Sequence, residues 1–216
     1  MTIDVAAGES RTAALCALAQ QTRELMDAVI GTGVEEDELV AVAAELTALT
    51  ERLEATVRVS RRSYDIASDG TVRHLGNAAI GAANPFAVPL VVERLASGGV
   101  RAEVSFRPLH EGPPGAVHGG ITAMALDHLL GQAVAVAGLA GMTGTLTIRY
   151  RAPVPYDRPV VVTAEHTRTE GRKAWADARV MLPDGTLLAE ATGIFITPTA
   201  WLNGPPIPTA PDSAGQ

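Results

Sequence analysis

The chain has 216 residues, of which 47% are hydrophobic and 19% charged, a composition that indicates a globular protein and excludes a disordered one. Its formal net charge of −7 argues against a nucleic-acid-binding protein, which would carry a basic excess. The single cysteine, Cys16, excludes a disulfide framework and a cysteine-rich zinc site.

The sequence also indicates the cellular compartment of the protein. A lone cysteine fits a reducing compartment, and the amino terminus, MTIDVAAGES, has acidic residues where a secretory signal needs positive charge. The most apolar stretch, residues 121–148, is interrupted by Asp127, His128 and several glycines, so it is a poor membrane span. We expect a soluble, cytoplasmic protein that binds neither nucleic acid nor a membrane.

The first 60 residues differ from the rest in charge and in pattern. They hold eleven acidic residues against four arginines and so carry the whole net charge. Hydrophobic positions recur there at alternating steps of three and four residues: Leu15, Leu18, Thr22, Leu25 and Val29, then Leu39, Val42, Leu46, Leu49 and Leu53. This heptad spacing predicts two helices separated by the turn at residues 31–33, with the acids of residues 35–38 at the favourable end of the second helix dipole. We interpret residues 1–60 as an α-helical hairpin that packs or stabilises an oligomer, with a partner-binding module as the alternative.

The remaining chain predicts a small α+β fold. Residues 61–87 read as a linker with turn signals, and from residue 88 onward hydrophobic residues alternate with polar ones in the period of β-strands. Two strands come before one helix and four follow it: residues 90–95 and 100–106, the helix at about 119–137, then 145–151, 160–168, 173–180 and 187–196. An antiparallel sheet wrapped around a single apolar helix satisfies this order over residues 88–197. The proline-rich residues 198–216 are expected to form a flexible tail.

The chemistry concentrates at the start of the predicted central helix, in His118-Gly119-Gly120. Glycines at a helix start expose backbone N–H groups beside the positive end of the helix dipole. Such a site can receive a carbonyl oxygen that becomes an oxyanion. The alternative is that both glycines merely allow close packing at a tight corner.

Asp127 lies on an apolar stripe of the same helix, with Ala123, Met124, Leu130 and Gly131 as its helical neighbours. We expect it to be buried, and a buried carboxylate costs several kcal/mol unless it has a partner. Clefts are where such perturbed carboxylates do acid–base or nucleophilic work, so we favour a catalytic role. A satisfied buried acid, hydrogen-bonded for example to a neighbouring subunit, is the alternative.

The run from His118 to Asp127 closely resembles the PaaI-like group of hot dog-fold acyl-CoA thioesterases. Further matches follow in the same order, at Thr143 and at residues 150–155, 170–173 and 190–196, so that the resemblance covers residues 84–197. It implies a hot dog fold, in which an antiparallel sheet wraps around one central helix. It also implies hydrolysis of an acyl-CoA thioester to a free acid and coenzyme A, without metal or other cofactor.

The resemblance also implies roles for individual residues. Gly119, with Gly120 beside it, would polarise the thioester carbonyl, and Asp127 would act as general base or nucleophile. Thr143, at the start of the third strand, would help position water or the acid. Gly112 stands where some relatives carry an Asn, so one carbonyl- or water-orienting amide is missing here.

The coenzyme A part of the substrate carries phosphates, which require cations for binding. Arg172 and Lys173 are the better candidates among the later arginines and lysine, because in relatives their hairpin-like segment often lies near the nucleotide. His118 would contribute to the substrate site by orienting its loop. The histidines show no metal-ligand spacing.

The spacing of the two reacting groups predicts an assembly. Gly119 and Asp127 are eight residues apart on one helix, hence about 12 Å along its axis. A thioester carbonyl and its attacking group must meet within roughly 3 Å, so we expect a homodimer, or a dimer of dimers, in which one subunit supplies the glycine and the other the acid.

We expect the helical hairpin to pack on the body or between subunits, to leave the thioester untouched and to affect the chemical step little. The alternative function is a non-catalytic acyl-CoA-binding or regulatory hot dog protein.

Overall fold

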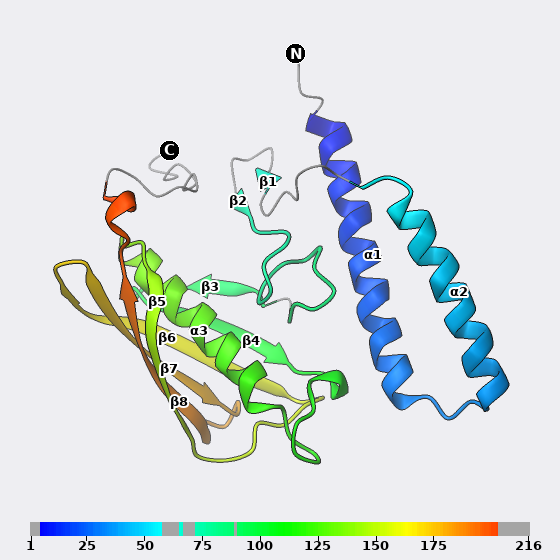
Figure 1. Ribbon diagram of the computed structural model, residues 1–216. Coiled ribbons are helices and arrows are strands. Elements are labelled where there is room, and N and C mark those ends of the chain that lie inside the picture. The colour runs from blue at the N-terminus through cyan, green and yellow to red at the C-terminus, as the bar shows by residue number, and fades with distance from the viewer. Residues whose placement is uncertain (1–4, 58–64, 67–71, 89, 203–216) are drawn as a thin grey trace.

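A single helix, α3 (Gly119–Val136), lies against one face of a six-stranded antiparallel sheet (Figure 1). The computed structural model describes residues 5–57, 65–66, 72–88 and 90–202. The strands of the sheet are β3 (Val92–Arg94), β4 (Val100–Ser105), β5 (Met142–Tyr150), β6 (Pro159–Glu170), β7 (Lys173–Met181) and β8 (Leu187–Ile196). Their spatial order is β3-β4-β6-β7-β8-β5, so the chain crosses from β4 through α3 to the opposite edge of the sheet.

The helix is enclosed because it is apolar on most of its circumference and the inner face of the sheet is made of small residues. On β7 the inward positions are Ala174, Ala176, Ala178 and Val180, all buried, and the polar residues between them face outward. The buried side chains of α3 are Thr122, Ala125, Leu126, Leu129, Leu130, Ala133 and Val134. These two sets form one hydrophobic core with the inward residues of β4, β6 and β8.

The predicted order of two strands, one helix and four strands is confirmed, and so is the enclosed helix. One difference lies in residues 61–87, which were expected to be a linker. There the chain forms a two-stranded sheet, β1 (Asp65–Ile66) and β2 (Val72–Arg73). Its strands are too short for an alternation of polar and hydrophobic residues to be recognised in the sequence. Of the predicted tail, residues 199–201 form a short 3-10 helix, while residues 203–216 lie outside the described residues, as do 58–64 and 67–71.

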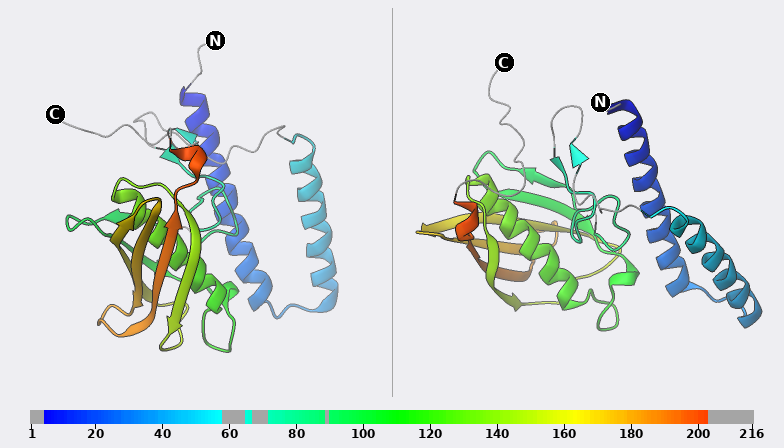
Figure 2. Two further views of the ribbon diagram at one scale, coloured as in Figure 1. Left: turned by 60° about the vertical axis from the view of Figure 1, so that its left-hand side comes forward. Right: turned by 45° about the horizontal axis from the view of Figure 1, so that its top comes forward.

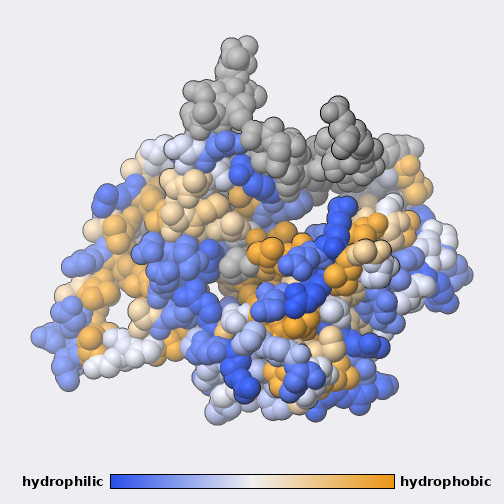
Figure 3. All heavy atoms as spheres, turned by 180° about the vertical axis from the view of Figure 1, so that it is seen from behind, coloured by the Kyte–Doolittle hydropathy of each residue, from blue (hydrophilic) through white to orange (hydrophobic). Residues whose placement is uncertain are grey.

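The predicted helical hairpin is confirmed as α1 (Val5–Gly31) and α2 (Glu36–Glu54). Figure 2 shows α1 between the sheet and α2. The heptad positions, however, do not form the contact with the body: α2 buries none of its side chains, and Leu18 of α1 is 43% exposed. Apolar side chains therefore appear among polar ones on the hairpin surface, at the left of Figure 3.

A different face of α1 docks on the body, at residues spaced four apart: Ala19, Arg23 and Asp27. Ala19 and Arg23 are buried, and the Arg23 guanidinium donates to the backbone carbonyls of Asn84 (2.8 Å) and Ala82 (3.3 Å). The apolar periodicity could not indicate this face, because polar contacts fix it. None of the helices in the described part of the chain is both long and apolar enough to cross a membrane.

Gly193, on the inner face of β8, provides a test of how closely sheet and helix pack. A Cβ there would lie 2.7 Å from Phe195 Cε2 and 3.2 Å from Leu130 Cδ1, and Phe195 is itself buried. We expect Gly193→Ala to lower the free energy of unfolding by about 1–3 kcal/mol, as overpacking does. Denaturant unfolding measures this, with Gly33→Ala as control, because nothing lies within 4 Å of a Cβ at Gly33. Equal stability of the two variants would contradict the close packing.

Candidate active site

Helix α3 crosses β5 so that two pairs of residues meet at different points along the strand. Near the start of β5, Thr143 Oγ1 donates a hydrogen bond to Asp127 Oδ1 at 2.7 Å. At its end, Tyr150 Oη donates to the carbonyl oxygen of Gly119 at 2.7 Å. Because β5 is an edge strand, both pairs lie at the open margin of the sheet.

The position of Asp127 corrects one expectation. Its side chain is only partly buried in the single chain, although its neighbours along α3 are apolar. The reason is that Asp127 faces the margin beside β5, which no further strand among the described residues covers. Thr143 satisfies one carboxylate oxygen there and fixes the direction of the group.

The start of α3 is capped by the side chain of His118. His118 Nδ1 accepts a hydrogen bond from the Gly120 N–H at 3.0 Å, and the His118 carbonyl accepts from the N–H groups of Ile121 and Thr122. Gly119 N–H, by contrast, makes no hydrogen bond within the described residues. Of the two glycine N–H groups, the one at Gly119 is therefore free to bind an anionic oxygen at the positive end of the helix dipole.

Both glycines lie close to neighbouring side chains. A Cβ at Gly120 would lie 3.1 Å from His118 Nδ1, and one at Gly119 would lie 3.3 Å from Tyr150 Oη, so either neighbour would have to shift by a few tenths of an ångström. Tight packing and the free N–H of Gly119 thus occur together. Both features belong to the same helix start.

Tyr150 is a site residue to which sequence reasoning gave no role. Partial burial raises the pKa of Tyr150 above its ordinary value, so the hydroxyl keeps its proton and donates to Gly119. A signal existed, because an aromatic residue ends a strand whose other members are mostly exposed and polar. Its partner on α3, however, could not be inferred from spacing.

The loop before the helix explains the glycine at position 112. A Cβ there would lie 2.6 Å from the Cα and 2.9 Å from the Cβ of His118, so no side chain fits. Glu111, next to Gly112, is bound within the loop by one of its carboxylate oxygens. Its Oε1 accepts hydrogen bonds from the Gly115 N–H (2.8 Å) and the Tyr156 hydroxyl (3.1 Å), which fixes the loop and raises the pKa of Tyr156.

Arg172 and Lys173 lie at the tight β6–β7 turn, in which Gly171 has a positive φ of 57°. Strand register aligns Thr143 with Phe195 and Phe195 with Ala174, so this turn lies two strands from Thr143, about 10 Å across the sheet. Both side chains are exposed, and Arg172 Nη1 donates to the Thr197 carbonyl at 2.9 Å. The two cations are thus at the Asp127 end of the sheet and away from Gly119.

Next to Asp127, His128 is a partly buried titratable group that sequence reasoning did not single out as functional. Burial lowers the pKa of His128 to about 4; neighbouring Asp127 opposes the shift and His74 adds to it. The ring is therefore neutral at physiological pH, with Gln132 Nε2 at 3.4 Å from its Nε2. Within the described part of the chain, no three His, Cys, Asp or Glu side chains gather closely enough to hold a metal ion.

Comparisons with known proteins agree with this architecture. The sequence profile of the Thioesterase superfamily matches residues 114–189. The crystal structure of a thioesterase superfamily protein is 33% identical and superposes with a TM-score of 0.76, covering 84% of this chain and 94% of that one. This chain belongs to the thioesterase superfamily. The predicted hot dog fold is thereby confirmed.

Other relatives match over a shorter range. Acyl-coenzyme A thioesterase THEM4 of Xenopus laevis is 34% identical over 90 residues, and that of Bos taurus is 40% identical over 90 residues. These alignments cover 41% of this chain and 40% and 37% of the two relatives, so the chain spans about two fifths of their length. The match to the superfamily crystal structure covers more of this chain, 84% of it. Residues 58–216, which follow the hairpin, make up less than three quarters of the chain, so they cannot account for the whole match. The similarity to that protein therefore extends into the helical hairpin.

The low pKa of His128 predicts an acid-dependent loss of stability. Between pH 6.5 and 4 the unfolded chain binds a proton at this residue and the folded chain does not, so stability falls as the pH drops through that window and levels off below about 4. We expect His128→Gln to reduce this slope, measured as melting temperature against pH. His166→Gln is the control, because the His166 ring is exposed and hydrogen-bonded to Thr169. An unchanged slope in His128→Gln would contradict the assignment.

Proposed function

We propose that the protein is an acyl-CoA thioesterase that hydrolyses its substrate to a free acid and coenzyme A. The observation that carries the proposal is the placement on one helix of a free N–H at Gly119 and a carboxylate, Asp127, oriented by the Thr143 hydroxyl. These are the two groups that hydrolysis of a thioester needs, a donor for the developing oxyanion and a base or nucleophile. The curated names of the acyl-coenzyme A thioesterase relatives support the same activity.

In this proposal each group has a defined task. Gly119 N–H donates to the thioester carbonyl oxygen, which gains negative charge as the acyl carbon becomes tetrahedral. Thr143 occupies Asp127 Oδ1 and leaves Oδ2 to take a proton from water or to attack directly. The C–S bond then breaks and the coenzyme A sulfur leaves as thiolate, which takes up a proton. Where water attacks, the free acid forms in this step; where Oδ2 attacks, water then hydrolyses the acyl–Asp127 anhydride to the free acid and restores the carboxylate. Gly120 supports the site indirectly, because its N–H donates to His118 Nδ1 and so holds the ring that caps α3.

A homodimer completes the site. Gly119 and Asp127 of one chain stay about 12 Å apart along α3, too far to act on one carbonyl. The nine-residue edge strand β5 has unpaired backbone groups along its outer side, which favours pairing with another strand. Pairing of β5 with β5 of a second copy would bring two antiparallel α3 helices together, so that each site takes its glycine from one subunit and its acid from the other.

The remaining parts of the chain have proposed tasks as well. We assign residues 88–197 to the thioesterase unit, with Arg172 and Lys173 as candidates for the phosphates of coenzyme A. Residues 1–60, 61–87 and 198–216 form the hairpin, the linker and the tail of this division. The alternative, a non-catalytic acyl-CoA-binding or regulatory protein, is favoured by one observation: no amide fits at Gly112.

A panel of acyl-CoA esters, with release of the free thiol as readout, separates the two functions. We expect turnover of at least one ester and a loss of about a hundredfold or more in kcat for Asp127→Asn, since the amide cannot act as base or nucleophile. Asp177→Asn is a matched control, because Asp177 Oδ1 accepts an equivalent threonine hydrogen bond, from Thr192 at 2.6 Å, on the exposed face of β7. Binding without turnover of any ester would support the regulatory alternative, and normal turnover by Asp127→Asn would remove that residue from the mechanism.

Mixed dimers test the shared site. Gly119→Val and Asp127→Asn subunits should each be inactive alone, the first because a branched side chain at position 119, next to Tyr150, should shield the N–H from the substrate. After subunit exchange of equal amounts, half of the dimers carry both kinds of subunit and one intact site each, so about a quarter of wild-type activity should return. Exchange is verified by mass on differently tagged subunits. If exchange occurs and no activity returns, both groups act within one chain.

A further inference from the structure

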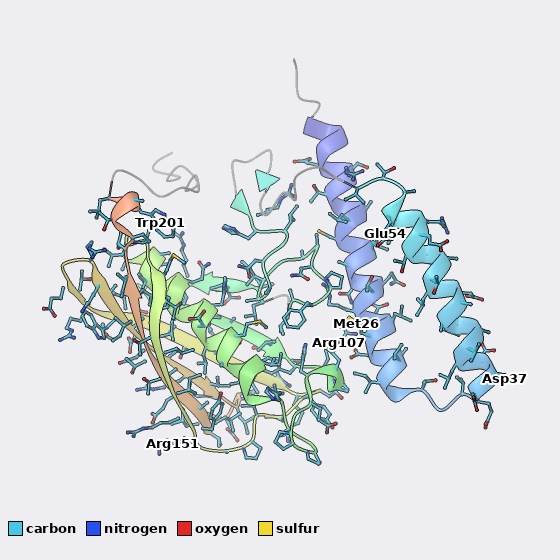
Figure 4. The ribbon with its side chains drawn as sticks, viewed as in Figure 1. Met26, Asp37, Glu54, Arg107, Arg151 and Trp201 are labelled. Atoms are coloured by element: carbon cyan, nitrogen blue, oxygen red, sulfur yellow. The ribbon has the colours of Figure 1, made fainter. Side chains whose placement is uncertain are left out.

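The hairpin contacts the body next to the loop that leads to the candidate active site. Figure 4 shows Arg107 where α1 meets the body, near Met26. Nε and Nη2 of Arg107 both donate to Asp27 Oδ2, and each of the two side chains is 25% exposed. Arg107 lies two residues after the end of β4 and directly precedes the short 3-10 helix η1 (Pro108–His110).

Arg107 determines where η1 begins. Its backbone N–H donates to His110 Nδ1 at 3.0 Å, and its carbonyl accepts from the His110 N–H at 2.9 Å. His110 is 5% exposed and packs edge-on against Phe106, with ring centroids 5.9 Å apart. Burial lowers the pKa of His110, which keeps Nδ1 an acceptor and preserves this ring of hydrogen bonds. Arg107 and His110 therefore form one rigid unit.

This unit continues into the start of α3. The His110 carbonyl accepts a hydrogen bond from the His118 N–H at 2.8 Å, and His118 Nδ1 in turn caps Gly120. Gly112, between His110 and His118 in the chain, lies against His118 with no room for a Cβ. Hydrogen bonds thus connect Asp27 of α1, through Arg107 and His110, to the residue that precedes Gly119.

We expect the Asp27–Arg107 pair to contribute little to the free energy of unfolding. Partly exposed ion pairs contribute little to stability. Asp27 Oδ1, moreover, is buried without a hydrogen-bond partner among the described residues, which costs free energy. What the pair does is to hold the Arg107 side chain in one direction, because two of its donors converge on the same carboxylate oxygen.

We propose that Asp27 and Arg107 are positioning residues, which hold the His110–Gly120 loop and through it the Gly119 N–H in place. This inference rests on the proposed function for its catalytic consequence. It differs from the expectation that the hairpin affects the chemical step little, because in this proposal α1 fixes the loop that leads to Gly119. The hairpin is then a part of the enzyme's active-site scaffold.

The test compares two variants on the same face of α1. Asp27→Ala removes the anchor of η1, whereas Arg23→Ala removes the anchor to residues 82–84 and leaves η1 untouched. Amide hydrogen exchange of full-length protein should show that His118 and Gly120 exchange about tenfold faster or more in Asp27→Ala, and at the wild-type rate in Arg23→Ala. Asp27→Glu, which keeps the carboxylate, should recover most of the protection.

Kinetics with acyl-CoA supply the second readout. A misplaced oxyanion donor should lower kcat about tenfold or more in Asp27→Ala with KM little changed, while Arg23→Ala lowers the melting temperature and keeps kcat. Unchanged exchange at His118 and Gly120 in Asp27→Ala overturns the proposal, and so does faster exchange without a fall in kcat. If wild-type protein turns over no ester, the proposed function fails, and the exchange data alone decide whether the pair positions the loop.

Discussion

The enclosure of one apolar helix by a sheet with a small-residue inner face is the constraint on which the other features depend. Seven side chains of α3 are buried, and the alanines of β7 together with Gly193 leave the space that the helix occupies. The groups that carry the proposed chemistry are mounted on this helix, at its capped start and at Asp127. Because the packing of α3 leaves little freedom, the directions of those groups are fixed before any substrate arrives.

The same enclosure explains why the site is open. Six strands cover the buried face of α3 and stop at β5, so one side of the helix reaches the margin of the sheet. A carboxylate is tolerated at Asp127 because it lies at this margin, where Thr143 bonds one oxygen and the group avoids the cost of full burial. In the proposed dimer, a second copy of the chain would pair with this strand edge and complete the candidate site at the same margin.

Polar contacts, and not the heptad stripes, attach the hairpin to this body. Arg23 reaches the carbonyls of residues 82–84, and Asp27 holds Arg107 at the end of β4. Most heptad positions stay exposed on the single chain, although the superfamily crystal structure is similar over more than the sheet and helix alone. The hairpin is therefore joined to the body of sheet and α3 close to the loop that carries His118.

The order of the elements, the alternation of β7 and the limits of α3 were determined by the sequence alone, because hydrophobic periodicity and glycine signals act over a few neighbouring residues. The motif from His118 to Asp127, together with the later matches at Thr143 and residues 150–155, 170–173 and 190–196, also indicated the superfamily and the fold. Only the tertiary structure decided that His118 occupies the Gly120 N–H, that Gly112 has no room for a side chain and that Asp27 meets Arg107. Such contacts join residues up to eighty positions apart, and they depend on strand order and on the crossing of α3 to the far edge, which local patterns do not encode.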